Sequence, residues 1–317
     1  MRTLIGFPWD RFSSSITSFA RDSIYRSGIG RSLIALGQVT VLLFTPAVAL
    51  FVPIYGISDS MSCDGVRSIG AFCLGDDVGL TREAVAVFLI VILLWVIVGY
   101  FPRYTAPVHL WATASVSSYI SLPDGGEAAA QAVVLLLLVV SLGDRRINHW
   151  LLKAQYRPSF IQPVVWAAAI VVTLQVSWIY LQASMSKLAV TEWQQGSALY
   201  YVARDPMFGV SGLLTEPYLW LTGQPWGTLF LSWGAIIIEF AIAIMILTSA
   251  RLRSTALVLA ILLHSAFIVF IGLWSFALIM IGCVACATFP VKGESPELQN
   301  LNPRSGEANL ESVNAKS

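Results

Sequence analysis

The sequence has few charged residues, few histidines and few cysteines. Only 12% of its 317 residues are Asp, Glu, Lys or Arg, and 56% are hydrophobic. A soluble domain carries roughly 25% charged residues, so the composition excludes an ordinary soluble protein. Three histidines and four cysteines leave few groups for a metal centre, and we expect none. The net charge of +1 identifies no partner by itself, and we expect no nucleic-acid partner.

Long apolar runs take the place of the missing charges. Several of them exceed the roughly 20 residues with which a helix crosses the hydrocarbon core. We therefore predict an all-α integral membrane protein with about eight transmembrane helices. The third and fourth spans are short, and either form a tilted pair or a re-entrant pair around a Pro-Asp-Gly-Gly turn. The expected spans are 32–55, 84–101, 108–122, 128–142, 159–184, 227–247, 255–273 and 274–290.

The basic residues alternate between successive loops. Segment 1–31 has five Arg against two Asp, and loop 143–158 is basic, whereas loop 56–83 is acidic. Under the positive-inside rule this pattern places both termini in the cytoplasm. Three regions follow: an amphipathic cytoplasmic segment over 1–31, a transmembrane helical domain over 32–290, and a disordered cytoplasmic tail over 291–317. The alternative for the first segment is a solvated leader.

The four cysteines fall into two pairs of different character. Cys63 and Cys73 share a loop placed outside, where the oxidising environment favours a disulfide between them. Cys283 and Cys286 form a C-x-x-C inside the last span. A metal or redox role is the usual reading of that spacing, but no His or carboxylate lies near it in sequence. We interpret these two cysteines as small packing residues.

Lys187 is the most informative residue of the chain. It follows a 29-residue stretch, 158–186, that contains no charged residue and no His. A cation at that depth either snorkels to the surface or performs a function. It could pair with Glu192 at the outer surface, or desolvation could make it a general base or nucleophile. The residues alone leave both readings open.

Two other polar residues lie inside predicted spans. Glu239 is in the middle of the sixth span and His264 is midway along the seventh. Each is about ten positions from the short loop between the two spans, so they fall at similar depth and could hydrogen-bond. Such a pair could be functional or could only order the bundle. His109 and His149 are expected to be interfacial anchors instead.

The stretch QVSWIYLQASMSKLAVTEWQQGSALYYV also carries a family resemblance. It resembles the Q…Y-x-x-A-x-x-K-L…W-x-x-G pattern of the horizontally transferred transmembrane (HTTM) superfamily, which includes the vitamin K-dependent γ-glutamyl carboxylase. Segments such as GIGRSLIALGQVTVLLFTP, SSYISLPDGGEAAAQ and SLGDRRINHW resemble its sporulation-delaying-protein B (SdpB) branch. One extra residue separates Lys187 from Trp193 relative to the carboxylase pattern, and no soluble luminal domain corresponds.

The resemblance implies a function and a site. The SdpB branch is linked to a secreted antimicrobial peptide toxin, whose disulfide-containing precursor is processed with an SdpA-like partner protein. We therefore expect a multi-pass protein of the bacterial cytoplasmic membrane, in contact with membrane lipid, that helps to mature or export such a peptide. Lys187 would be the base, because the carboxylase has its base at the matching position. The expected site residues are Lys187, Glu239 and His264, with Asp124, Glu127, Glu192 and Trp193 on the outer side.

Two alternatives remain at this stage. One is a carboxylase-like or oxidoreductase-like enzyme that uses a lipid quinone as its cofactor. The other is a non-catalytic scaffold or immunity-type membrane protein. Retention of full activity by a Lys187→Ala variant would favour the scaffold.

Overall fold

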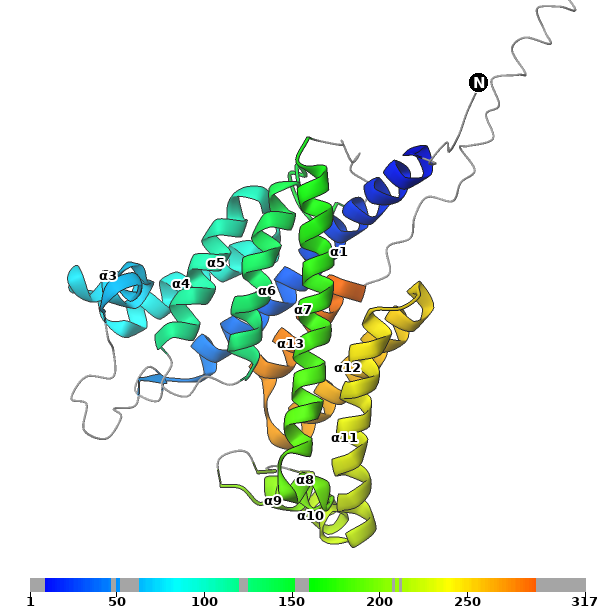
Figure 1. The fold of residues 1–317 in the computed structure, drawn as a ribbon. Helices are drawn as coiled ribbons and strands as arrows, with labels where there is room; N and C mark the ends of the chain where they lie inside the picture. Colours follow the sequence, from blue (N-terminus) through cyan, green and yellow to red (C-terminus); the bar gives the residue numbers. More distant parts are fainter. Residues whose placement is uncertain are drawn as a thin grey trace, which may run out of the picture.

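The computed structural model of the chain describes residues 9–46, 50–51, 63–119, 125–151, 160–206, 209–210 and 213–288. Every regular element within these ranges is a helix, and one isolated bridge pairs Tyr100 with Asn148. Figure 1 shows the long helices packed into a bundle, with short helices at two of its edges. The long helices are α1 (Trp9–Phe44), α4 (Arg82–Val98), α5 (Pro102–Tyr119), α6 (Gly125–Leu142), α7 (Gln162–Leu188), α11 (Pro225–Ile246), α12 (Ala250–Ile271) and α13 (Trp274–Thr288).

Each of the eight expected spans corresponds to one of these long helices. Five of the helices have the length and hydropathy to cross a membrane: α1 from Arg21 onward, α6, α7, α11 and α12. The chain is therefore a helical, multi-pass membrane protein, and the count of eight crossings stays a prediction. The boundary expected at residue 31 falls inside the continuous helix α1, and the tail 291–317 lies outside the described residues.

The first and third expected spans differ most from their helices. Helix α1 begins at Trp9 and ends at Phe44, whereas the expected first span is 32–55. Helix α5 begins at Pro102, six residues before the expected start, and includes Pro107 in its first turns. Both α5 and α6 have 18 residues, which corresponds to about 27 Å at 1.5 Å per residue. That length is close to the thickness of the hydrocarbon core.

The loops rich in arginine gather at one end of the bundle. The α4–α5 turn pairs with the α6–α7 loop, because the Phe101 amide donates to the Ile147 carbonyl at 2.7 Å and the His149 amide donates to the Gly99 carbonyl at 3.0 Å. Gly99 has φ +85°, and a Cβ there would lie 2.7 Å from the His149 ring, so only glycine fits this contact. Arg26 of α1 donates to the Ala287 carbonyl, which places the end of α13 here as well. We call this region the arginine end.

Three short helices cover the opposite end of α7 and α11. They are α8 (Thr191–Gln194), α9 (Ala198–Ala203) and α10 (Thr215–Gly223), and Figure 1 shows them grouped at the bottom of the view. Hydroxyls of Thr228 and Ser232 on α11 accept hydrogen bonds from the first backbone amides of α9. Tyr218 of α10 stacks on Phe270 of α12, with 4.5 Å between the ring centroids. We call this region the short-helix end.

Helix α1 packs very closely against α13. A Cβ placed on Gly30 would lie 2.0 Å from the Cys286 sulfur, and one on Gly282 would lie 2.8 Å from the Gly30 carbonyl oxygen. Small residues permit such close approach between membrane helices. Cys283 and Cys286 are free thiols buried in this contact, which agrees with a packing role.

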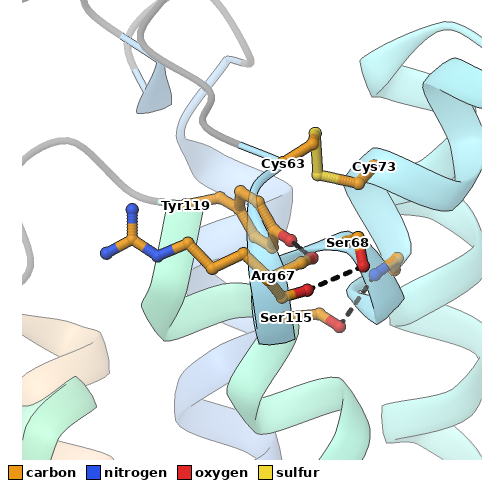
Figure 2. Close-up of a disulfide and its surroundings, with 8 residues drawn as sticks. Cys63, Arg67, Ser68, Cys73, Ser115 and Tyr119 are labelled. Atoms are coloured by element: carbon orange, nitrogen blue, oxygen red, sulfur yellow. Dashed lines mark hydrogen bonds between the residues drawn. A yellow bond between two sulfur atoms is a disulfide. The ribbon is translucent and has the colours of Figure 1, made fainter.

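The polar loop before α4 is held by a disulfide between Cys63 and Cys73 (Figure 2). It connects Cys63, two residues before the short 3-10 helix η1 (Gly65–Ile69), to Cys73 in α3 (Ala71–Asp77). Three side chains of α5 bind this segment: the Tyr119 hydroxyl donates to the Arg67 carbonyl, Ser115 accepts from the Ala71 amide, and the Trp111 indole donates to the Ile69 carbonyl. The disulfide loop is thus attached to the helix bundle and not only to itself.

Candidate functional site

Lys187 lies in the last turn of α7 and faces α11, where it meets Glu239. Its Nζ is 2.8 Å from Oε1 and 2.7 Å from Oε2 of Glu239, so the ammonium donates to both carboxylate oxygens. The Lys187 side chain is 21% exposed and that of Glu239 is 6% exposed. A charge at this depth is tolerated only when it is paired. The pair therefore explains how the sequence can place a carboxylate in the middle of an apolar helix.

Two further contacts define the surroundings of the Lys187 ammonium. The ammonium also donates a hydrogen bond to the Ala183 carbonyl of the preceding turn, at 3.4 Å. The Trp193 ring, from the short helix α8, lies 5.3 Å from Nζ in a cation–π contact. The aromatic ring thus covers the side of the pair that faces the short helices, while the carboxylate faces the bundle.

A second polar pair lies two turns deeper in the bundle. The Tyr180 hydroxyl and His264 Nε2 are 2.7 Å apart, and both side chains are buried. Tyr180 precedes Lys187 by seven residues, so the two share one face of α7 at a separation of about 10 Å along the axis. Phe267 and Phe276 both make edge contacts with the His264 imidazole ring.

The α7 face that holds both pairs is polar along most of its length. Its polar residues recur at alternating spacings of four and three, which keeps them on one side of a helix. They are Thr173, Ser177, Tyr180, Ser184 and Lys187. Ser177 donates to the Ala243 carbonyl of α11 at 2.7 Å, so this face packs against the same helix that carries Glu239.

The predicted hydrogen bond between Glu239 and His264 is wrong. Glu239 binds Lys187, and His264 binds Tyr180. The prediction considered only the hairpin of α11 and α12, in which the two residues have similar depth. Helix α7 packs against α11 and supplies a partner for each residue, and a charged ammonium is a better partner for a carboxylate than a neutral imidazole.

Of the other expected site residues, the structure places Trp193 against the Lys187–Glu239 pair. Trp193 contacts Lys187, whereas Glu192 is exposed and does not form the expected alternative ion pair with Lys187. Glu127 is buried at the start of α6, whereas the Lys187 ammonium donates to Glu239 and to the Ala183 carbonyl. Asp124 lies outside the described residues.

A charged network at the arginine end escaped the sequence analysis. Arg146 donates through Nε and Nη2 to both carboxylate oxygens of Asp144, at 2.9 and 2.7 Å. It also donates to the carbonyls of His149 and of Ile24 on α1, and its guanidinium lies 4.5 Å from the Tyr25 ring centroid. The Arg146 side chain is 7% exposed and the Asp144 side chain is 2% exposed. The signal in sequence was only the cluster of charges in DRRINHW.

His149 belongs to this network, which corrects its expected role as an interfacial anchor. It is buried, and its Nε2 lies 3.0 Å from the Ser32 hydroxyl of α1. Burial is the main cause that lowers the pKa of His149 to about 3, and the positive charges of Arg31 and Arg146 add to it. The imidazole is therefore neutral at physiological pH.

His109 is also buried and not interfacial. Because α5 begins at Pro102, His109 lies about two turns inside the helix, and its side chain is 0% exposed. The apolar pattern alone placed the start of this helix too late, since residues 102–107 include Arg103 and two prolines.

The comparisons with known proteins give the family. Sporulation-delaying protein SdpB of Bacillus subtilis (strain 168) is 34% identical over 266 residues, which cover 83% of this chain and 80% of that protein. The chain belongs to the SdpB family. A second Bacillus subtilis relative, the uncharacterized protein YitO, is 29% identical over 268 residues, covering 83% of this chain and 85% of YitO. No protein-family model matches the chain, and no solved structure does.

The described part of this SdpB-family chain contains no group of three or more His, Cys, Asp or Glu side chains arranged to hold a metal ion. The described site brings together an amine, a carboxylate, a phenol and an imidazole on three neighbouring helices. An amine and a carboxylate in direct contact can exchange a proton, which gives two forms: an ammonium–carboxylate pair and an uncharged amine–acid pair.

Proposed function

We propose that this SdpB-family protein takes part in a sporulation-delaying-protein-like pathway, by maturing or exporting a secreted peptide toxin at the Lys187–Glu239 site. The family membership supports the pathway, because the Bacillus subtilis relative is named for sporulation delay. The HTTM resemblance supports Lys187 as the base. The observation that carries the proposal is the direct, buried contact between the Lys187 ammonium and the Glu239 carboxylate.

The contact supplies the chemistry that a lysine base needs. A lysine must lose its proton before it can accept one from a substrate. Glu239 can take that proton over a distance of 2.7 Å without any movement of the helices. The uncharged amine–acid form also avoids two charges at a poorly solvated site. Glu239 thereby holds the proton that Lys187 releases. The Trp193 ring covers one side of the amine.

We further propose that the short-helix end faces outward and that both termini are cytoplasmic. The positive-inside rule places basic loops in the cytoplasm, and the α6–α7 loop with Arg145 and Arg146 lies beside the α4–α5 turn that precedes Arg103 at one end of the bundle. A Cys replacing the exposed Gln195 should react with an impermeant thiol reagent in intact cells. A Cys replacing the exposed Ile147 should react only after lysis. The opposite labelling pattern would reverse the orientation.

The background of this labelling experiment is low. Cys63 and Cys73 are joined in a disulfide, and Cys283 and Cys286 are buried. The wild-type protein is therefore expected to take up little reagent in either preparation.

The test of the site uses a Bacillus subtilis strain that lacks its own SdpB and keeps its SdpA. The wild-type chain, Lys187→Arg and Lys187→Ala are expressed in it, and mature peptide in the medium is measured by mass spectrometry. Arginine can keep the ion pair with Glu239 but stays protonated, since its pKa exceeds about 12. We expect both variants to insert normally and to lose peptide production equally.

The two rival functions predict other outcomes. A scaffold needs only a cation at this position, so peptide production by Lys187→Arg at the wild-type level would refute the base and favour a scaffold. If the wild-type chain produces no peptide in Bacillus subtilis, the same variants are compared in the native host, again by mass spectrometry of mature peptide in the medium. Glu192→Gln is the matched control, because Glu192 is exposed and five residues from Lys187; its production should equal that of the wild type.

One observation favours a quinone-dependent reaction as a second candidate. Nδ1 of His264 is buried and has no hydrogen-bond partner among the described residues, and the ring makes edge contacts with both Phe267 and Phe276. An unpaired nitrogen among aromatic rings fits the polar oxygen and flat ring of a lipid quinone, which would supply redox chemistry there when bound. Extraction of a quinone with the protein after mild purification would support this candidate, and His264→Phe should then reduce the yield of quinone.

A further inference from the structure

Helices α1 and α5 share a buried row of polar side chains that the Lys187 site does not use. On α5 the polar residues recur every four positions: Thr105, His109, Thr113 and Ser117. Two hydrogen bonds align the row with α1. Arg31 donates to the Thr105 hydroxyl at 3.2 Å, and the Thr113 hydroxyl donates to Gln38 Oε1 at 3.2 Å. His109 lies between these two contacts along α5.

Several polar atoms of this row lack partners. Both ring nitrogens of His109, Nε2 of Gln38 and the hydroxyl oxygen of Ser117 have no hydrogen bond to any described residue. His109 and Gln38 are both 0% exposed. A neutral imidazole presents one donor and one acceptor, and the Gln38 amide presents donors. Leaving such groups unpaired in the interior costs free energy. The row is therefore expected to bind a molecule that both donates and accepts hydrogen bonds.

The charges at the two ends of the row decide what kind of occupant fits. Arg31 is 2% exposed and donates to the Pro102 carbonyl and to Ser141 of α6, as well as to Thr105. Its guanidinium closes the row at the arginine end and repels cations. Glu127 is buried near the other end of α6, fourteen residues from Ser141. A carboxylate there disfavours an anion. A neutral molecule with donors and acceptors remains, and water meets this description.

We propose that α1, α5 and α6 hold a file of bound water that enters beside Ser117 in the last turn of α5, reaches His109 and ends at Arg31. The file pairs the unpartnered atoms of Ser117, Gln38 and His109 in turn. It makes His109 a group that exchanges protons with one face of the membrane only, because Arg31 blocks the other end. This inference does not depend on the function proposed for Lys187.

The test labels side chains that touch internal water. X-ray radiolysis of the purified protein in ¹⁸O-water generates hydroxyl radicals from bound water, and mass spectrometry locates the incorporated ¹⁸O. The variants are Thr113→Cys, which places a thiol in the row, and Val116→Cys, which places one a turn away on an apolar face of α5. Thr113 and Val116 are both 0% exposed, and the native buried Cys283 is an internal control in each protein.

We expect the thiol of Thr113→Cys to take up severalfold more ¹⁸O than the thiol of Val116→Cys or that of Cys283. Equal labelling of all three thiols, high or low, overturns the proposal, because it shows either general penetration or no internal water. The wild-type protein gives a second measurement without any substitution. His109 should carry ¹⁸O, and an unlabelled His109 overturns the proposal even if Thr113→Cys fails to fold.

Discussion

Two largely buried ion pairs in the described part of the chain differ in how many segments they hold together. Arg146 uses its guanidinium to bind Asp144, the carbonyl of His149 and the carbonyl of Ile24, so it joins the α6–α7 loop to α1. Lys187 of α7 forms its ion pair with α11 and contacts the Trp193 ring of α8, and its side chain is three times as exposed as that of Arg146, at 21% against 7%.

The difference teaches how a buried charge can be structural in one place and reactive in another. Arginine has a planar fork of donors and stays protonated, which suits a fixed junction of several acceptors. Lysine is a single ammonium that can lose its proton, and Lys187 retains access to solvent beside one carboxylate. This difference fits the proposed chemical role of the Lys187–Glu239 site and a structural role for the arginine end, and the following experiments test both.

The largest effect is expected at Arg146. Arg146→Ala would leave the Asp144 carboxylate buried without its partner, and breaking a buried pair in this way costs about 3–5 kcal/mol. Arg146→Lys should recover little, because one ammonium cannot reach all the acceptors of the fork. Thermal unfolding in detergent measures the loss. The control is Arg145→Ala at the exposed neighbouring position, where a change within about 0.5 kcal/mol is expected. A stable Arg146→Ala protein would remove the structural role.

A smaller effect is expected from a double-mutant cycle at the other pair. Lys187→Ala and Glu239→Ala each leave a partner unpaired, at a cost of about 1–3 kcal/mol. Because the two side chains are in contact, the double variant should be more stable than the sum of the single changes predicts. Glu239→Ala combined with His264→Ala is the reference cycle, since these two residues bind different partners and their effects should add. Coupling in the reference cycle and additivity in the first would contradict the arrangement of the two pairs.

The smallest effect is the pH dependence that His149 gives to the arginine end. The folded protein holds the pKa of His149 at about 3, against about 6.5 in the unfolded chain. Between these values the unfolded chain binds more protons, so stability is full above pH 6.5 and is lost as the pH falls. At pH 5 the loss is at most about 2 kcal/mol.

The measurement compares the pH dependence of unfolding in the wild type and in His149→Gln between pH 7 and pH 5. The variant lacks the titrating group, so its curve should be flatter than that of the wild type by the contribution of His149. The other histidines titrate in both proteins and cancel in the difference. Parallel curves for the two proteins would show that His149 is protonated as easily in the fold as in the unfolded chain.

The helices were predictable because their signal is local. A long apolar run must become a helix in lipid, where every backbone group needs an internal partner. Each expected span accordingly has its helix. The disulfide was predictable for a related reason, since Cys63 and Cys73 are ten residues apart on one loop. Two boundaries were misplaced. Polar residues conceal the N-terminal half of α1 from a pattern based on hydrophobicity, and Arg103 and two prolines do the same for the first turn of α5.

The partners of the polar residues were not predictable from the hairpins alone. Glu239 and His264 have the same depth in adjacent helices, and nothing in the linear sequence says that α7 lies beside both. The Arg146 network is hidden for the same reason, because its acceptors come from residues as far apart in sequence as Ile24 and His149.

The sequence by itself determined that this protein is a helical membrane protein, and it singled out Lys187 and Glu239 as residues that need an explanation. Only the tertiary structure shows that these two residues form an ion pair with each other. Hydrophobicity and charge act on each segment separately, so they can be read along the chain. The pairing of buried charges depends on which helix faces which, and that is set by the packing of all the helices together, through contacts such as Gly30 against Gly282 that leave no periodic signal.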